Sequence, residues 1–188
     1  MSSPTNWMKK EYDDLVKKGF DWKPPVIGGP STGRAIIDGK ERIMLCANNY
    51  LSMSNHPKVK EAAIDAVKSH GAGSGSVRPI AGNMDIHNEL EDTIARFKNR
   101  EAALYYQTGF AVNSGLIPQL AGKNDSIISD QLNHGSIIDG VRLSGVKKEN
   151  RTIYSHNDMG ELEDRLKEAT KKSEKTLVIS DGVFSMDG

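Results

Sequence analysis

The sequence predicts an α/β protein with a mostly parallel sheet and flanking helices. Short apolar segments rich in β-branched residues alternate with helical segments through the second half of the chain, at the spacing of βαβ units. Polar and glycine residues follow several of these segments directly, as they do where parallel strands end at a ligand-binding edge. A chain of 188 residues can bury a sizeable core and suits one domain, or one domain with an additional arm.

The first 45 residues are expected to form an arm with a hairpin. Residues 5–18 have the apolar spacing of an amphipathic helix, which ends at Gly19. Prolines then favour an extended linker over residues 23–30. Residues 35–37 and 42–45 flank Asp38-Gly39, a dipeptide that is typical of a tight β-hairpin. Residues 1–45 are therefore assigned to an arm, and residues 46–188 to the first part of a larger domain.

The remaining elements follow in order along the larger domain. A helix is expected to begin at Pro57, because proline is well tolerated in the first helical turn. A glycine-rich loop comes next, over residues 71–82. Further helices are expected at residues 86–98, 110–120, 136–143 and 159–172, and strands at residues 102–106, 126–129, 152–154 and 176–179.

Composition excludes several classes of function. Lysine plus arginine and aspartate plus glutamate number 25 each, so no charge excess indicates a nucleic-acid or membrane partner. The N-terminus lacks the pattern of a signal peptide, and a single cysteine, Cys46, fits a reducing compartment, so a cytoplasmic location is expected. The five histidines lack the spacing of metal ligands, so no metal site is expected.

Three loops that leave predicted strands are candidates for a binding site. Residues 107–110 precede a helix, whose first N–H groups and dipole favour an anion such as a phosphate. An ordinary strand-to-helix turn is the alternative. His134 follows the next strand, where its ring could contact a ligand or transfer a proton, or could instead cap the following helix. Asp181 and Ser185 follow the last strand, where the aspartate could orient a neighbour such as His134 and the serine could donate to a phenolate-type oxygen; the alternative is that both are turn residues.

The glycine-rich loop offers a different function, dinucleotide binding. Residues 71–77 contain three glycines in alternate positions. The dinucleotide fingerprint requires a strand before the glycines and a helix that opens within them. Here a predicted helix precedes the loop, so nicotinamide or flavin binding by this loop is not expected.

The chain resembles the α-oxoamine synthases, a branch of the fold-type I pyridoxal-phosphate enzymes, from about Ile43 to Gly188. The resemblance implies pyridoxal 5′-phosphate as cofactor, an amino acid and an acyl-CoA as substrates, and a homodimer. It rests on six motifs in the same order, namely residues 48–51, 73–78, 87–91, 109–110, 129–143 and 181–188. Residues 129–143 are most similar to the members that condense glycine with acetyl-CoA, the glycine C-acetyltransferases. The alternative is 8-amino-7-oxononanoate synthase, which joins alanine to a pimeloyl thioester.

The resemblance also implies roles for individual residues. Gly109 and Phe110 match the pair whose backbone helps to hold the cofactor phosphate. His134 matches the catalytic histidine that stacks on the pyridine ring beside the substrate. Ser185 matches a serine that hydrogen-bonds near the phenolic oxygen of the ring. Asn48 matches an asparagine near the substrate carboxylate.

Other positions that match or depart from the family motifs carry weaker implications. Asp181 matches an acidic position behind these contacts, and Arg78 lies in a matching loop without an assigned role. Ser52 replaces a usual glycine, which would strain the backbone if that position requires a positive φ. Asn83 replaces a more usual hydroxyl or aromatic residue.

Three groups of the family have no counterpart in this sequence. They are the Schiff-base lysine, an aspartate on the pyridine nitrogen and an arginine for the substrate carboxylate. The segment is therefore expected to be inactive alone, and the enzymatic expectation applies to a full-length protein. An aminotransferase of the same fold type and a non-catalytic partner subunit are the alternatives.

Overall fold

The computed structural model describes residues 3–187. The chain divides into two compact units, Met1–Met84 and Asp85–Gly188, and each is described by itself. The expected division between an arm of residues 1–45 and a domain of residues 46–188 stays a prediction. Within the described range, no helix is long and apolar enough to cross a bilayer.

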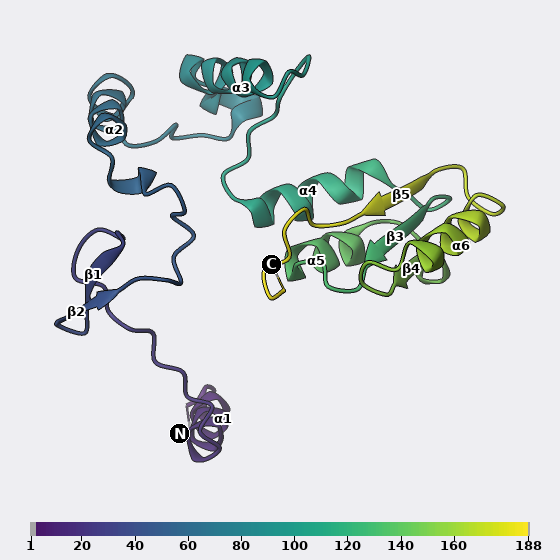
Figure 1. Ribbon diagram of the computed structural model, residues 1–188, viewed down its shortest axis with the longest axis horizontal. Coiled ribbons are helices and arrows are strands. Elements are labelled where there is room, and N and C mark those ends of the chain that lie inside the picture. Colours follow the sequence, from purple (N-terminus) through teal and green to yellow (C-terminus); the bar gives the residue numbers. More distant parts are fainter. Residues whose placement is uncertain (1–2, 188) are drawn as a thin grey trace. The chain divides into compact units, whose positions relative to one another are not determined.

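The second unit is built on a parallel sheet of three strands, as the sequence predicts. The strands are β3 (Ser126–Asp130), β4 (Arg151–Tyr154) and β5 (Thr176–Ile179). Their order is β4-β3-β5, and both pairings of β3 are parallel. Figure 1 shows the three arrows side by side. Because β3 lies between two partners and is buried along its whole length, it forms the centre of the unit.

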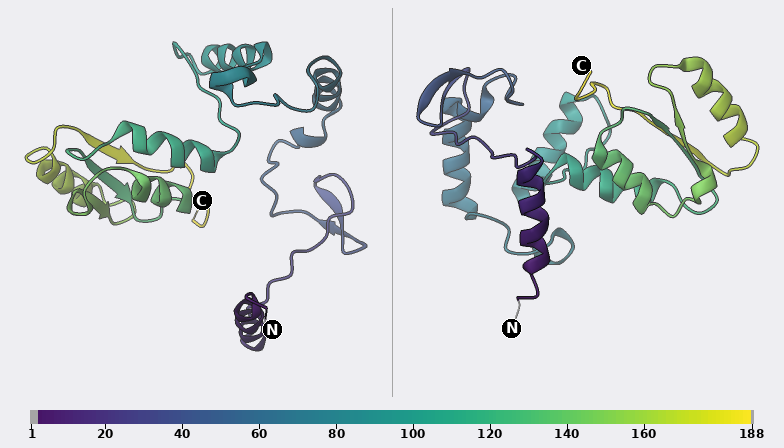
Figure 2. Two further views of the ribbon diagram at one scale, coloured as in Figure 1. Left: turned by 180° about the vertical axis from the view of Figure 1, so that it is seen from behind. Right: turned by 90° about the horizontal axis from the view of Figure 1, so that it is seen from below.

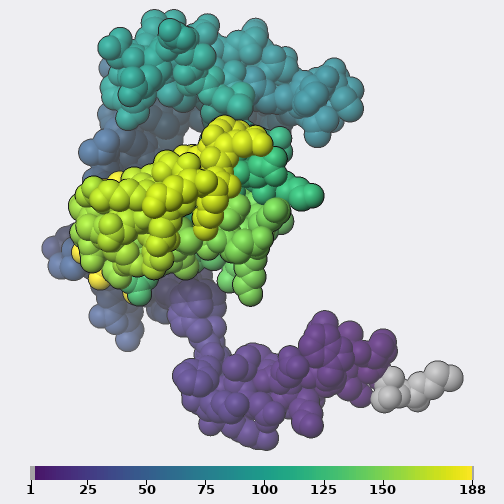
Figure 3. Space-filling model, turned by 90° about the vertical axis from the view of Figure 1, so that its right-hand side faces the viewer, coloured from purple at the N-terminus to yellow at the C-terminus, as the bar shows by residue number. Residues whose placement is uncertain are grey.

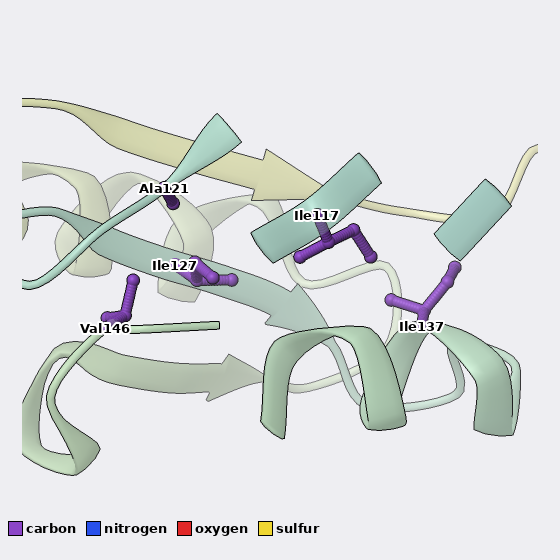
Figure 4. Packing of buried hydrophobic residues seen from close by; sticks show 5 residues of the cluster. All are labelled: Ile117, Ala121, Ile127, Ile137 and Val146. Carbon is purple, nitrogen blue, oxygen red and sulfur yellow. The ribbon is translucent and has the colours of Figure 1, made fainter. Parts of the chain in front are cut away.

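Helices cover both faces of this sheet. The helices α4 (Gly109–Leu120) and α5 (Gly135–Leu143) lie on one face, and α6 (Met159–Ala169) lies on the other, as Figure 2 shows. The cause is the alternation of side chains along a strand. Ile127 points into a cluster with residues of α4 and α5, drawn in Figure 4, whereas Ile128 packs with Tyr154 and Ala169 toward α6.

The contact between α4 and α5 depends on Gly140. A methyl group at this position would overlap the backbone carbonyl of Asn113 and come within 2.8 Å of Ile117 Cδ1. A residue without a Cβ therefore lets the two helix backbones approach closely. This close approach also brings the first turn of α5 beside Asn113 of α4.

The strand predicted at residues 102–106 does not form. This segment has the composition of a strand, but a strand also requires a partner backbone, and the described parallel sheet consists of β4, β3 and β5 alone. No ladder pairs with these residues in the described structure. The amide of Tyr105 instead donates to the carboxylate of Glu91 in α3 (Asp85–Phe97), at 2.9 Å.

The first unit contains the helices and the hairpin that the sequence predicts. The helices are α1 (Asn6–Lys17) and α2 (Pro57–His70), and the hairpin pairs β1 (Arg34–Ile37) with β2 (Lys40–Ile43). Asp38 and Gly39 form the turn with φ of 48° and 76°, the left-handed values that a tight hairpin turn requires. Three short helical turns complete the described elements, at Met53–Asn55 and Arg78–Gly82 here and at Lys148–Asn150 in the second unit.

Ser52 adopts the conformation that glycine favours. Its φ is 52° and its ψ is 26°, within the left-handed region. A side chain with a Cβ costs about 1–2 kcal/mol in this region. The serine that replaces the family's glycine therefore introduces local backbone strain.

Two carboxylates bind backbone amides at the start of α6. Asp158 caps the helix by accepting the amide of Glu161 at 2.9 Å, and the Glu161 carboxylate reaches back to accept the amide of Ser155 at 2.8 Å. The Ser155 amide, followed by Arg165, lowers the pKa of Glu161 from 4.5 to about 2. The charged form of Glu161 is therefore favoured by folding.

We expect Glu161→Gln to destabilise the protein at neutral pH but progressively less below pH 4.5. Because folding lowers the pKa, the stabilisation is complete above the unfolded value and is lost as the pH falls toward about 2. The measurement is the difference in thermal unfolding midpoint between wild type and variant, at several pH values. Glu163→Gln is the control, since this exposed carboxylate on the same helix forms a surface ion pair with Lys167. A difference for Glu161→Gln that stays constant with pH would contradict the expectation.

Candidate functional site

Asn133 holds together two of the predicted site loops. It lies in the loop after β3 and is 5% exposed. Its Nδ2 group donates to Ser129 Oγ at 2.9 Å and to the carbonyl of Ile179 at 2.8 Å. Its Oδ1 atom accepts the amide of Asp181 at 2.8 Å. The loop after β3 and the loop after β5 are thus joined at the carboxyl edge of the sheet.

Asp181 positions the main chain of His134. The Asp181 Oδ2 atom accepts the backbone amide of His134 at 2.7 Å. The sequence suggested that this aspartate could orient a neighbour such as His134. The contact runs through the backbone, so the carboxylate fixes the start of α5 and leaves the imidazole ring to other partners.

The His134 ring caps α5 with one of its nitrogens. Nδ1 accepts the amide of Ser136 at 3.1 Å and lies 2.7 Å from Ser136 Oγ. The helix-capping alternative therefore holds for Nδ1. His134 itself is exposed, and none of the hydrogen bonds found within residues 3–187 involves its Nε2 atom. The other side of the ring is open to a ligand.

The loop after β4 joins the same edge through His156, which sequence reasoning did not single out. His156 Nδ1 lies 3.0 Å from Asp130 Oδ1, and its ring packs edge-on against Phe184 at 4.3 Å between centroids. Burial alone would raise the pKa of Asp130, but hydrogen bonds from the Leu132 amide and the His156 ring outweigh it and lower that pKa. Its position directly after a predicted strand was the signal that could have identified His156.

The start of α4 has free donors for an anion. Thr108 caps the helix by accepting the amide of Ala111 at 3.0 Å. In the part of the chain that the structure describes, the amides of Gly109 and Phe110 have no hydrogen-bond acceptor. A Cβ built on Gly109 meets nothing within 4 Å, so space remains beside these amides. Such a helix start suits a phosphate.

The same end of the second unit carries the start of α4 and the strand-exit loops. In Figure 1 the arrowheads of β3 and β5 point toward the end where α4 begins. One helical turn into α4, Asn113 Nδ2 donates to Ser136 Oγ at 2.9 Å. Gly109 and His134 therefore belong to neighbouring helix starts, as the topology predicts.

The remaining predicted site residues are exposed or lie in the first unit. Ser185 is exposed in a turn directly after Phe184, and Figure 3 shows this C-terminal segment, in yellow, at the surface. Gly188 of the same motif lies outside the described residues. Asn48 is exposed in the first unit, so its place beside the substrate stays a prediction. Arg78 Nε donates to Asn83 Oδ1 at 2.8 Å in that unit.

A pocket of about 340 Å³ lies at the opposite, amino edge of the sheet. It contains none of the predicted site residues, and lysines dominate its lining, which consists of Lys123, Asn124, Lys147, Asn150, Lys171, Lys172, Ser173 and Glu174. Within residues 3–187, no cluster of three or more histidine, cysteine, aspartate or glutamate side chains could hold a metal ion. The chemistry-bearing residues gather at the carboxyl edge instead.

Known proteins are similar in sequence to almost the whole of this chain. Residues 40–188 match the aminotransferase class I and II family. The chain is 50% identical to an 8-amino-7-oxononanoate synthase of Alkaliphilus metalliredigens and 48% identical to one of Treponema denticola. Each match covers 97% of this chain and 45% of the relative. The chain thus spans less than half the length of the relatives it matches.

Solved structures with the same fold are also similar in sequence. A serine palmitoyltransferase from S. paucimobilis, solved with PLP and myriocin bound, superposes with a TM-score of 0.84 at 30% identity. A serine palmitoyltransferase from Sphingomonas wittichii gives 0.82 at 31% identity. These matches cover 97% and 98% of this chain, and 45% and 46% of the solved chains. The fold is therefore that of part of a fold-type I pyridoxal-phosphate transferase.

Proposed function

Because the chain belongs to the aminotransferase class I and II family, we propose that the full-length protein is a pyridoxal-phosphate-dependent acyltransferase of the 8-amino-7-oxononanoate synthase type. The observation that carries this proposal is the identity of 46–50% to synthases of that name from eight organisms, over at least 95% of the chain. This favours alanine and a pimeloyl thioester as substrates. The reaction of glycine with acetyl-CoA, which residues 129–143 suggested, becomes the alternative.

The arrangement at the carboxyl edge fits the cofactor in two respects. The free amides of Gly109 and Phe110 and the space beside Gly109 suit its phosphate. The His134 ring is exposed, which suits stacking of its face on the pyridine ring. When bound, pyridoxal phosphate supplies an electron sink for charge that develops on the amino acid.

Each residue of the proposed site then has a defined task. Gly109 and Phe110 bind the phosphate through their backbone amides. His134 orients the pyridine ring and contacts the substrate, while Asp181 holds the His134 backbone at the start of α5. Ser185 is proposed to donate to the phenolic oxygen, and Asn48 to contact the substrate carboxylate. A homodimer stays a prediction from the family resemblance.

The proposal is tested with the full-length protein loaded with pyridoxal phosphate. We expect thiol release from pimeloyl-CoA in the presence of alanine, and a visible absorbance of the bound cofactor. His134→Ala should weaken cofactor binding by about two- to tenfold, because the stacked ring is lost. The measurements are a thiol assay and a cofactor titration.

Parallel reactions distinguish the alternatives. Thiol release only with glycine and acetyl-CoA would assign the other α-oxoamine synthase reaction, and release only with serine and palmitoyl-CoA would assign the activity named for the solved structures. Exchange of amino groups with a keto acid, without thiol release, would contradict acyl transfer. Absence of a cofactor absorbance would contradict the pyridoxal-phosphate site itself.

A further inference from the structure

A chain of hydrogen bonds crosses from α4 to the His134 ring. Asn113 Nδ2 lies 2.9 Å from Ser136 Oγ, and Ser136 Oγ lies 2.7 Å from His134 Nδ1. The amide of Ser136 also points at His134 Nδ1, at 3.1 Å. Ser136 is 3% exposed, so water competes little for its hydroxyl group. The proton positions along this chain follow from which atoms can donate.

An amide nitrogen donates and cannot accept. The Ser136 oxygen therefore accepts from Asn113, and its single hydroxyl proton stays available for donation to His134 Nδ1. The Ser136 backbone amide can also only donate. Two donors thus converge on Nδ1, which must carry a lone pair rather than a proton. In the neutral ring the proton then resides on Nε2, the atom on the open side.

We propose that Asn113 and Ser136 are positioning residues that hold His134 in the tautomer protonated on Nε2, so that the ring offers a hydrogen-bond donor to an acceptor atom of the ligand. This inference rests on the proposed function for its ligand, but the tautomer is a property of the chain alone. In the resting site, His134 is then a donor rather than a general base. Neither Asn113 nor Ser136 has to touch the ligand.

Asn113→Asp tests the direction of the hydrogen-bond chain. A carboxylate of the same shape accepts the Ser136 hydroxyl proton, which turns the Ser136 oxygen into an acceptor facing His134 Nδ1. We expect the ratio of the two neutral tautomers to shift toward Nδ1–H by about tenfold, the upper range for one hydrogen bond. The readout is the ring ¹⁵N chemical shifts of the full-length, histidine-labelled protein without cofactor, assigned with His134→Gln.

Two further variants separate the relay from a simple effect of charge. Gln119→Glu makes the same amide-to-carboxylate change at an exposed position of α4, and it should leave the tautomer ratio as in wild type. In a Ser136→Ala background the effect of Asn113→Asp should disappear, because the linking hydroxyl is gone. A shift that persists in this background would overturn the relay. So would an unchanged ratio in Asn113→Asp.

If Asn113→Asp does not fold, Asn113→Ala provides the test, because it removes the side-chain amide without adding a charge. Asn113→Ala frees the Ser136 hydroxyl to point elsewhere, and we expect a shift of about two- to threefold in the same direction. No shift in a folded Asn113→Ala would overturn the proposal. Because cofactor and substrates are absent, the result stands apart from the assay with alanine and pimeloyl-CoA, which decides the reaction.

Discussion

Gly140→Ala is expected to lower the free energy of unfolding by about 3 kcal/mol, the upper range for an overpacked contact. The added methyl group would overlap the carbonyl of Asn113 and lie 2.8 Å from Ile117 Cδ1. The first of these atoms belongs to a helix backbone, which cannot move aside as the end of a long side chain can. The helices α4 and α5 must therefore separate. The measurement is the urea unfolding midpoint of the full-length protein.

Gly115→Ala is the matched control for this prediction. Gly115 lies within α4, and a Cβ there would have only ordinary contact with Tyr106 Cε1, at 3.5 Å. Alanine is favoured over glycine within a helix by about 0.5–1 kcal/mol. We expect Gly115→Ala to be neutral or stabilising. Equal destabilisation by both substitutions would show that the close approach at Gly140 is not the cause.

Asn133→Ala is expected to destabilise the protein by about 2–4 kcal/mol. The substitution removes the hydrogen bonds of a buried side chain to the Ser129 hydroxyl, the Ile179 carbonyl and the Asp181 amide. Ser129 keeps the Asp130 carbonyl as a partner, so the Ile179 and Asp181 groups are the ones left unsatisfied, at about 1–2 kcal/mol each. We also expect weaker cofactor binding, since the Asp181 carboxylate that holds His134 would lose its anchor. Unfolding midpoints and a cofactor titration measure the two effects.

The control is Asn124→Ala. Asn124 is exposed and donates to Glu174 Oε1 at 2.9 Å, so its amide group can be replaced by water contacts. Its loss should change the free energy of unfolding by about 0.5 kcal/mol or less. If Asn133→Ala were equally mild, the two loops would be held in place by contacts other than this side chain.

The fold of the second unit followed from local pattern and topology. β-branched runs such as residues 176–179 predicted the strands, and their alternation with helices predicted the parallel pairing. The segment 102–106 has the same local character but no partner, and pairing depends on segments distant in the sequence. Likewise, nothing local to Gly140 indicates that the Asn113 backbone lies against it.

The candidate site could be predicted from one rule, that the carboxyl ends of parallel strands lie at the same edge of the sheet. This argument brought His134 and Asp181 together, and the structure shows them in contact. It did not reveal Asn133 or His156, because their partners, Ile179 and Asp130, come from other strands. It also treated helix capping and ligand contact as alternatives for His134. In the structure Nδ1 caps the helix, which leaves Nε2 for contact with a ligand.

The anchoring of Asn133 has a consequence for the order of assembly during synthesis. Its partners Ile179 and Asp181 follow it by 46 and 48 residues. Until those residues leave the ribosome, the edge of β3 that later pairs with β5 has no neighbour, and such unpaired edges are prone to association with other chains. The loop that carries His134 thus gains its fixed geometry only after these further residues have been synthesised, when the strand that protects β3 arrives.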